Sequence, residues 1–326
     1  MSQNQEFKSL GYIAAIFGGL SFGTIPILSA ILRDNNASSL EQSSVRLFFG
    51  AVIGIIFILF FFLFRRKELL QSLKLSTQRP YFIQGFFLAL MIVLYLSSIS
   101  LGTPAGEAAL LIQIHPIITL ILGSRFLGEK ITKAKLISVI LAITGIILLT
   151  EPWNWESFLQ AIVGDLLMIL LGILYAGYLL VNRWGTKYTQ QISPTVSIGW
   201  VLIWAFVIGI PLLLLLSLLP FSPQIISFSI TNIRMPKILG YGFLLAFFGS
   251  LVTYGLIMVA SKYIETSKVS ILVLSEPIGA IILGAIILKE PITIFYAFGG
   301  ITILIAATVI FLTSRFEENS TENVEE

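Results

Sequence analysis

The chain has 326 residues, of which 56% are hydrophobic and only 11% are charged, and its formal net charge is +3. Soluble domains carry about 25% charged residues, and a soluble globule of the present composition could not cover its surface with polar groups. These totals exclude a soluble enzyme, a nucleic-acid-binding protein and a disordered scaffold. What remains is a polytopic membrane protein.

Ten apolar runs are long enough to cross a bilayer, since a spanning helix needs about 20 mostly apolar residues. They are Leu10–Leu32, Val45–Phe64, Tyr81–Leu101, Gly106–Leu127, Ala134–Thr150, Ala161–Val181, Thr195–Leu219, Ile238–Ala260, Ser267–Leu288 and Ile294–Thr313. The first run is longer than the apolar part of a signal peptide, so we interpret it as a retained helix. The sequence predicts an all-α bundle of ten transmembrane helices.

The distribution of Lys and Arg predicts the orientation of this bundle. With a cytoplasmic N-terminus, 15 of the 20 basic residues fall on the inner side and 5 on the outer side. Cytoplasmic loops carry the excess of positive charge. We therefore expect a multi-pass protein of the cell membrane with both termini in the cytoplasm. The acidic residues 315–326 are expected to form a disordered cytoplasmic tail.

An internal repeat relates the fourth and ninth runs at an offset of 161 residues, with ten of 28 positions identical. The matched pairs that are not aliphatic are Pro116 with Pro277, Gly123 with Gly284, Glu129 with Glu290, and Thr132 with Thr293. The repeat unit holds five helices, and an odd number inverts the second copy in the membrane, as in many transporters. We expect residues 1–150 and 151–314 to form two inverted five-helix repeats.

Several stretches resemble one known family. They are GGLSFGTIPIL in the first run, Arg46 at the start of the second, HPIITLILGSRFLGEKIT in the fourth, GDLLMILLGILYAGYLL in the sixth and LSEPIGAIILGAIILKEPIT in the ninth. Over about residues 10 to 314 the chain is similar to the EamA-like branch of the drug/metabolite transporter superfamily. This resemblance implies a ten-helix exporter of a small organic solute, often an amino acid or a related metabolite.

Glu276 and His115 are the ionisable residues expected near the membrane midplane. Each lies about nine residues into its run, or about 13–14 Å deep at 1.5 Å per residue. Charges at that depth cost roughly 2.5–3.5 kcal/mol each, so they often mark a site for substrate or a coupling ion. A packing kink with a bond to a neighbouring helix is the alternative for either residue.

Prolines follow both residues, and Pro116 and Pro277 each remove a backbone N–H and loosen the helix. We expect these prolines to act as helix hinges. Polar and aromatic side chains near the midplane are candidates to line a cavity, with interior packing as the alternative for each. They are Thr24, Tyr95, Gln113, Tyr175, Tyr178, Tyr254 and Ser275.

Other charged residues favour structural roles. Arg46 is expected at the outer end of the second run, with its guanidinium extended to the headgroups. Glu107 and Asp165 begin helices, where acids satisfy free N–H groups. Glu129 and Glu290 lie at tight turns, where we expect each to cap the helix that follows it.

The favoured function is a secondary transporter that exports a small solute by alternating access, with a proton as a candidate coupling ion. Its alternative is a nucleotide-sugar or phosphate-ester antiporter of the same superfamily, whose cargo would require several cationic groups. An intramembrane enzyme and a channel are weaker alternatives. One histidine, no cysteine and no second clustered carboxylate do not make a coordination shell for a metal, and no cofactor motif or nucleotide loop is present in the sequence. The sequence does not identify the solute or the oligomeric state.

Overall fold

The structure is a computed structural model that describes residues 3–101, 111–150, 162–218, 228–289 and 294–325, and the described elements are helices. Seven segments among these residues are long and apolar enough to cross a membrane. They are Glu6–Asp34, Ser39–Phe64, Leu75–Ser98, Ile162–Thr189, Pro194–Ser217, Pro236–Tyr263 and Thr266–Leu288. Two shorter apolar helices are His115–Leu127 and Ala297–Thr313. The expectation of an all-α, multi-pass membrane protein is therefore confirmed.

The first half of the chain contains the helices up to residue 150. They are α1 (Gln3–Phe22), α2 (Thr24–Asp34), α3 (Ser39–Phe64), α4 (Arg66–Ser72), α5 (Leu75–Ser100), α7 (His115–Leu127) and α8 (Lys133–Thr150). Helices α1 and α2 form one segment that is interrupted at Gly23. The short helix α4 lies in a connection where the sequence predicted only a basic loop.

The second half contains two segments with irregular turns. Its elements are α9 (Ile162–Thr189), α10 (Pro194–Ser217), α12 (Ile230–Ile233), α13 (Pro236–Ala246), η2 (Phe247–Val252), α14 (Thr253–Tyr263), α15 (Thr266–Val273), α16 (Glu276–Leu283), η3 (Gly284–Leu288) and α17 (Ile294–Glu325). The elements η2 and η3 are π-helical turns. Such turns are uncommon and occur frequently at functional sites.

Polar caps decide where several apolar helices begin. Ser38 accepts a hydrogen bond from the backbone N–H of Glu41 at 3.2 Å, and the Glu41 carboxylate accepts one from the N–H of Ser38 at 2.9 Å. This capping box starts α3 at Ser39, six residues before the predicted start of the second run. Ser193 caps α10 in a similar way, with Pro194 at its first turn.

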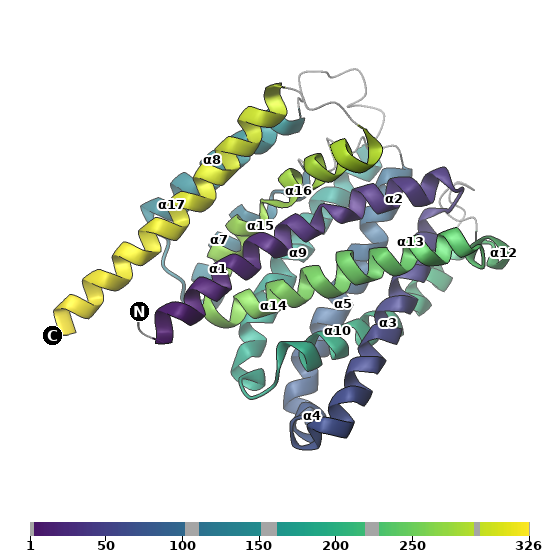
Figure 1. Cartoon of the computed structure of the whole chain (residues 1–326), viewed down its shortest axis with the longest axis horizontal. Helices are drawn as coiled ribbons and strands as arrows, with labels where there is room; N and C mark the ends of the chain where they lie inside the picture. Colours follow the sequence, from purple (N-terminus) through teal and green to yellow (C-terminus); the bar gives the residue numbers. More distant parts are fainter. Residues whose placement is uncertain (1–2, 102–110, 151–161, 219–227, 290–293, 326) are drawn as a thin grey trace.

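Helices from the two halves of the chain pack against one another throughout the bundle (Figure 1). Helix α8 packs along α17 at one side of the molecule, α3 packs on α10, and α5 packs on α9. Helix α1 lies against α14, α15 and α16, while α7 contacts α9 and α15. The N- and C-terminal ends of the chain lie at the same end of the molecule in Figure 1.

Glycines allow the closest of these contacts. A Cβ atom on Gly279 would lie 2.3 Å from the backbone oxygen of Leu20, and one on Gly23 would lie 2.3 Å from the backbone nitrogen of Ala280. A Cβ atom on Gly54 would lie 2.6 Å from the backbone oxygen of Gly199. The backbones of α1–α2 and α16 therefore touch directly. Close packing of this kind explains the small residues in the first and second runs.

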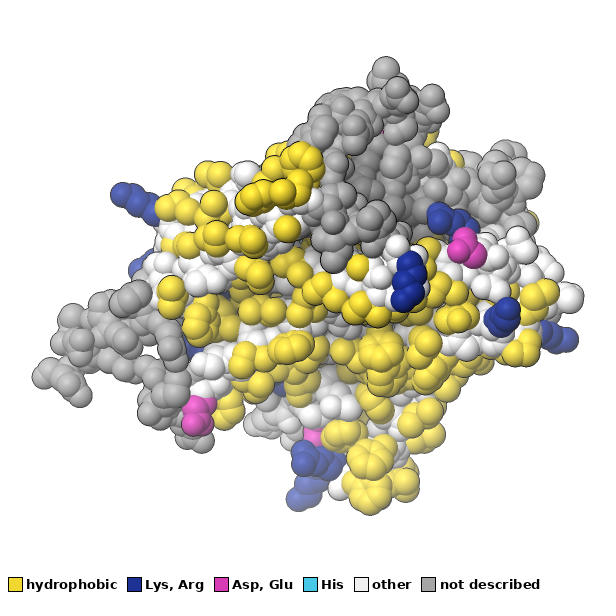
Figure 2. Space-filling view, turned by 45° about the horizontal axis from the view of Figure 1, so that its top comes forward, with side chains coloured by type: hydrophobic (Ala, Val, Ile, Leu, Met, Phe, Trp, Pro, Cys, Tyr) yellow, Lys and Arg dark blue, Asp and Glu magenta, His cyan; other side chains and the backbone are white. Residues whose placement is uncertain are grey.

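The outside of the bundle is apolar, as expected for a surface in contact with lipid. Figure 2 shows hydrophobic side chains over much of one face. Large side chains such as Leu63, Phe64 and Phe126 are 70% exposed or more. A soluble monomer rarely exposes apolar patches of this extent.

Helix α17 continues through the acidic tail to Glu325, whereas the sequence was expected to give a disordered tail after residue 314. The physical reason is that no glycine or proline follows Gly300. Nothing in the covalent chain therefore interrupts the helix that begins in the apolar segment.

Candidate functional site

Two helix breaks lie at Pro116 and Pro277, and their role as hinges stays a prediction. Helix α7 begins at His115, and α16 begins at Glu276 after α15 has ended at Val273. In both helices the proline is the second residue, where its missing N–H leaves no hydrogen bond unmade. His115 and Glu276 therefore occupy the same place at equivalent breaks, 161 residues apart. Both side chains are buried.

The His115 side chain joins α7 to α15. Its Nδ1 lies 2.7 Å from the Ser270 hydroxyl, and that hydroxyl donates a hydrogen bond to the Thr119 hydroxyl at 3.3 Å. The imidazole also meets the ring of Tyr175 edge-on, with centroids 4.6 Å apart. The second ring nitrogen, Nε2, is buried and has no hydrogen-bond partner. The imidazole is therefore held in place through Nδ1, while Nε2 has no partner.

Aromatic side chains from three segments surround this break. Phe22 contacts Tyr175 and Tyr254 with centroids 5.6 Å apart in each pair, and Tyr178 meets Tyr254 at 5.1 Å. The hydroxyls of Tyr175 and Tyr178 are buried without partners, as are both amide atoms of Gln113. Buried polar atoms are nearly always satisfied, so these unpaired atoms make the break a candidate site for ordered water or a ligand.

A small cavity lies beside this cluster. It has a volume of about 10 Å³, roughly the space for one water molecule. It is lined by Phe22, Ile25, Arg46, Met91, Ile92, Tyr95, Ile112, Leu171 and Tyr254. We call these lining residues, together with Gln113, His115, Tyr175, Tyr178 and Glu276, the central site.

The prediction for Arg46 is wrong. Its side chain does not extend to the headgroups but is 2% exposed and lines the small cavity. The reason is the capping box at Ser38, which places Arg46 about two turns inside α3 instead of at its end. The sequence signal that could have revealed this was the polar stretch Glu41–Ser44, which is buried along with it.

Two predicted lining residues donate hydrogen bonds to backbone oxygens. The Thr24 hydroxyl donates to the backbone oxygen of Ser21 at 2.7 Å, at the break between α1 and α2. The Ser275 hydroxyl donates to the backbone oxygen of Ile16 at 2.9 Å, which ties the break in α15–α16 to α1. These contacts correspond to the packing alternative for both residues.

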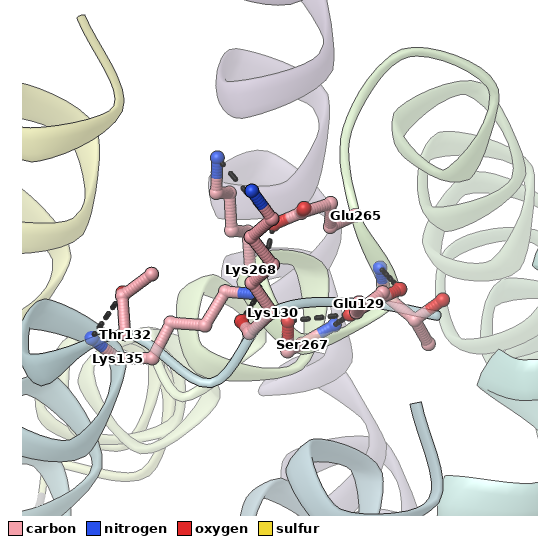
Figure 3. Close-up of polar contacts among 8 residues, drawn as sticks. Glu129, Lys130, Thr132, Lys135, Glu265, Ser267 and Lys268 are labelled. Carbon is pink, nitrogen blue, oxygen red and sulfur yellow. Dashed lines mark hydrogen bonds and ion pairs between the residues drawn. The ribbon is translucent and has the colours of Figure 1, made fainter. Parts of the chain in front are cut away.

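A polar cluster joins the two halves at the far ends of α7 and α14 (Figure 3). The Glu129 carboxylate accepts hydrogen bonds from the backbone N–H groups of Thr266 and Ser267 at 2.6 and 3.0 Å, and from the Ser267 hydroxyl at 2.6 Å. Glu129 therefore caps α15 from the other half of the chain, and the prediction that it caps the following helix is wrong. The reason is that the turn after α7 brings the Glu129 carboxylate within hydrogen-bonding distance of the first N–H groups of α15.

Ion pairs extend this cluster. Lys135 Nζ lies 2.9 Å from the Glu265 carboxylate and donates to the backbone oxygen of Lys130 at 2.7 Å, while Lys268 Nζ lies 3.5 Å from Glu265. Partial burial raises the pKa of Glu265, but the hydrogen bond from Lys135 and the charge of Lys268 outweigh that effect and hold it below its ordinary value. We call Glu129, Lys130, Lys135, Glu265, Ser267 and Lys268 the Glu129 cluster.

A wider pocket opens beside the Glu129 cluster. Its volume is about 590 Å³, which is in the range of small-molecule sites. Its lining is mostly polar and consists of Phe126, Leu127, Gly128, Glu129, Arg183, Thr186, Lys187, Gln190, Lys262, Tyr263 and Glu265. The described part of the chain contains no group of three His, Cys, Asp or Glu side chains suited to a metal ion. Glu107 and Glu290 lie outside the described residues.

The sequence was then compared with known families and proteins. The model of the EamA-like transporter family matches residues 9–151 and matches again at residues 162–312. The chain belongs to the EamA-like transporter family. The resemblance inferred from the fourth, sixth and ninth runs is therefore confirmed.

Relatives within this family have names that describe export. A probable amino-acid metabolite efflux pump of Salmonella typhimurium is 29% identical over 64% of the chain and 67% of the relative. A pseudopaline exporter of Pseudomonas aeruginosa is 24% identical over 47% of the chain and 51% of the relative. A crystal structure at 14% identity covers 95% of the chain and 99% of its own, with a TM-score of 0.70, which shows a shared fold.

Proposed function

We propose that this EamA-like protein is a secondary transporter that exports a small organic solute, such as an amino acid or a related metabolite, by alternating access. Its relatives include proteins named as an amino-acid metabolite efflux pump and a pseudopaline exporter. The chain acts in this proposal as a carrier and not as an enzyme. It spans the cell membrane ten times, with both termini in the cytoplasm.

The observation that carries the proposal is the pair of equivalent helix breaks at His115 and Glu276. Ionisable groups buried at membrane depth are expensive to retain, and those at broken helices typically bind substrate or a coupling ion. Around them, Gln113, Tyr175 and Tyr178 hold polar atoms without partners. A solute could satisfy these atoms. His115 or Glu276 could also take up the proton that is exchanged for it.

Three observations support an arrangement of two inverted five-helix repeats. If each helix is replaced by its equivalent in the other half, the α5–α9 contact becomes the α14–α1 contact, and the α3–α10 and α8–α17 contacts stay the same. All four contacts are present in the structure. Gly128 and Lys289, at equivalent positions, both adopt positive φ, and their N–H groups bond to the equivalent oxygens of Gly123 and Gly284. A lysine with positive φ is uncommon, so the same backbone conformation at Lys289 and at the equivalent Gly128 is a specific similarity between the halves. The family model also matches each half separately.

Alternating access needs a closure that can open. In the proposed orientation the Glu129 cluster lies on the cytoplasmic side, where it ties α7 and the turn before α8 to the start of α15. Residues 1–150 and 151–314 would then separate at this cluster when the protein opens inward. The central cavity of about 10 Å³ is too small for an organic solute, so the helices around it would have to move apart for a solute to bind.

The test is flux into proteoliposomes, screened with amino acids and nucleotide sugars, with and without a pH gradient. Glu276→Gln should remain folded and monodisperse yet lose most of its flux, because a neutral amide cannot provide the charge at the break. Glu6→Gln, a change of the same type at an exposed position, is the control and should keep wild-type flux. Flux of no solute by the wild type, or full flux by Glu276→Gln with unchanged pH dependence, would count against the proposal.

A further inference from the structure

Arg46 is a buried cation without an acidic partner. Its Nε donates to the Ser250 hydroxyl at 2.9 Å, and its Nη2 donates to the backbone oxygen of Gly249 at 2.6 Å. Within the described residues Nη1 makes no hydrogen bond, and the guanidinium forms no ion pair. A buried charge is normally paired, because desolvation without compensation is costly. Arg46 is therefore arranged to receive an anion.

The π-helical turn η2 fixes the direction of this guanidinium. Gly249 and Ser250 both belong to η2, where the wider turn makes a backbone oxygen and a hydroxyl available to α3. Two of the three guanidinium nitrogens are thus used to position the side chain. The third nitrogen remains for a ligand, on a residue that lines the central cavity.

Glu276 provides a carboxyl group at the same site. Its carboxylate is 8% exposed and forms no ion pair with any described residue. Its backbone lies next to the cavity wall, because a Cβ atom on Gly23 would be 2.8 Å from the backbone oxygen of Glu276, and the preceding residue, Phe22, lines the cavity with Arg46. A cation and an anion that are buried in one site but do not pair with each other leave a place for a ligand that carries both charges.

We propose that Arg46 binds the carboxylate and Glu276 the ammonium group of a zwitterionic solute, so that Arg46 determines specificity. This inference rests on the proposed transport function and names the class of solute. The remaining walls are apolar and include Phe22, Met91, Ile92, Ile112 and Leu171. They suit an α-amino acid with an apolar side chain. A phosphate ester would be repelled by Glu276, and a simple amine would be repelled by Arg46.

The test compares three probes with one carbon skeleton. They are L-leucine, isopentylamine, which lacks the carboxylate, and 4-methylpentanoate, which lacks the ammonium group. Binding to the purified full-length protein in detergent is measured by equilibrium dialysis. Wild-type protein should bind leucine more tightly than either probe. Losing one partner of a buried charge pair weakens binding by about 30-fold or more.

Arg46→Gln should weaken leucine binding by about 30-fold or more and abolish the preference for leucine over isopentylamine. Glu276→Gln should instead abolish the preference for leucine over 4-methylpentanoate. Arg46→Lys should keep part of the preference, since it keeps the charge but not the fork of donors. Arg33→Gln, at an exposed arginine of α2, is the control and should leave all three affinities unchanged. If part of a variant is unfolded, the apparent binding of all three probes falls by the same factor. The ratio of their affinities is therefore unchanged.

Equal binding of leucine and isopentylamine by the wild type, an unchanged ratio in Arg46→Gln, or binding of none of the three probes would overturn the zwitterion site. The same probes in proteoliposomes separate the two proposals. Charge-selective binding without flux would leave the site standing and reject transport. Flux of solutes without this charge rule would keep transport and reject the role of Arg46.

Discussion

Arg46, His115 and Glu276 show what single buried residues contribute to this protein. Each is held by neighbours or by a helix break, and each leaves a polar atom or a charge that the described protein does not pair. A core built only for stability would satisfy such groups or replace them with apolar ones. Their shared location at the central site is the reason for giving them a role in binding and not in packing.

Glu265 gives a prediction about acid sensitivity at the residue scale. Its pKa is held below the ordinary value of 4.5 by Lys135 and Lys268, despite its partial burial. A carboxylate whose pKa is lowered on folding contributes stability that is complete above its unfolded pKa and is lost as pH falls through its folded pKa. We therefore expect the thermal midpoint in detergent to fall as pH drops below about 4.5. Glu265→Gln should have a lower midpoint at neutral pH and a smaller loss in acid. An identical acid profile in the variant would contradict the prediction.

At the scale of elements, the seam between α7 and α15 runs from the central site to the Glu129 cluster. His115, Ser270 and Thr119 connect the two helices near the break, and Glu129 caps α15 at the other end. A carboxylate at the N-terminus of α15 also interacts favourably with the positive end of the helix dipole. This seam is where the two halves would have to part.

Glu129→Ala should therefore loosen the seam. Removing an acceptor of three hydrogen bonds leaves buried N–H groups unpaired, which costs about 1–3 kcal/mol for each group. We expect a lower thermal midpoint and faster labelling of a cysteine placed at Thr119, measured from the cytoplasmic side of inverted membrane vesicles. Glu68→Ala is the matched control, because Glu68 accepts a bond from the backbone N–H of Ser193 away from this seam. Equal labelling rates in both variants would argue against an opening at Glu129.

The all-helical, multi-pass class was predicted correctly because apolar runs of this length have few alternatives in a membrane, and the count of ten spans stays a prediction. The breaks at His115 and Glu276 were also predictable, since each proline fixes the local backbone. Arg46 and Glu129 were misassigned for a common reason. Their roles depend on η2 and on the start of α15, which are distant in sequence, and neither a hydropathy pattern nor a motif reports such contacts.

At the scale of the whole molecule, the family match to both halves and the contacts exchanged between them favour one carrier made of two related units. The membrane orientation of that carrier is a prediction from the 15-to-5 distribution of basic residues. Cysteines placed singly at Ser2 and Ser320 should react with an impermeant reagent only after the cells are opened, because the native chain has no cysteine. Reaction of either site in intact cells would reverse the assigned orientation or change the number of spans.

The central claim is that one buried site is exposed to each side of the membrane in turn. A single cysteine at Gln113, whose side chain is 3% exposed in the structure, tests it most directly. In oriented vesicles this cysteine should react with an impermeant thiol reagent from either side, and a transported solute should change both rates. Reaction from one side alone, or from both sides at rates that a saturating, transported solute does not alter, would contradict alternating access through this site.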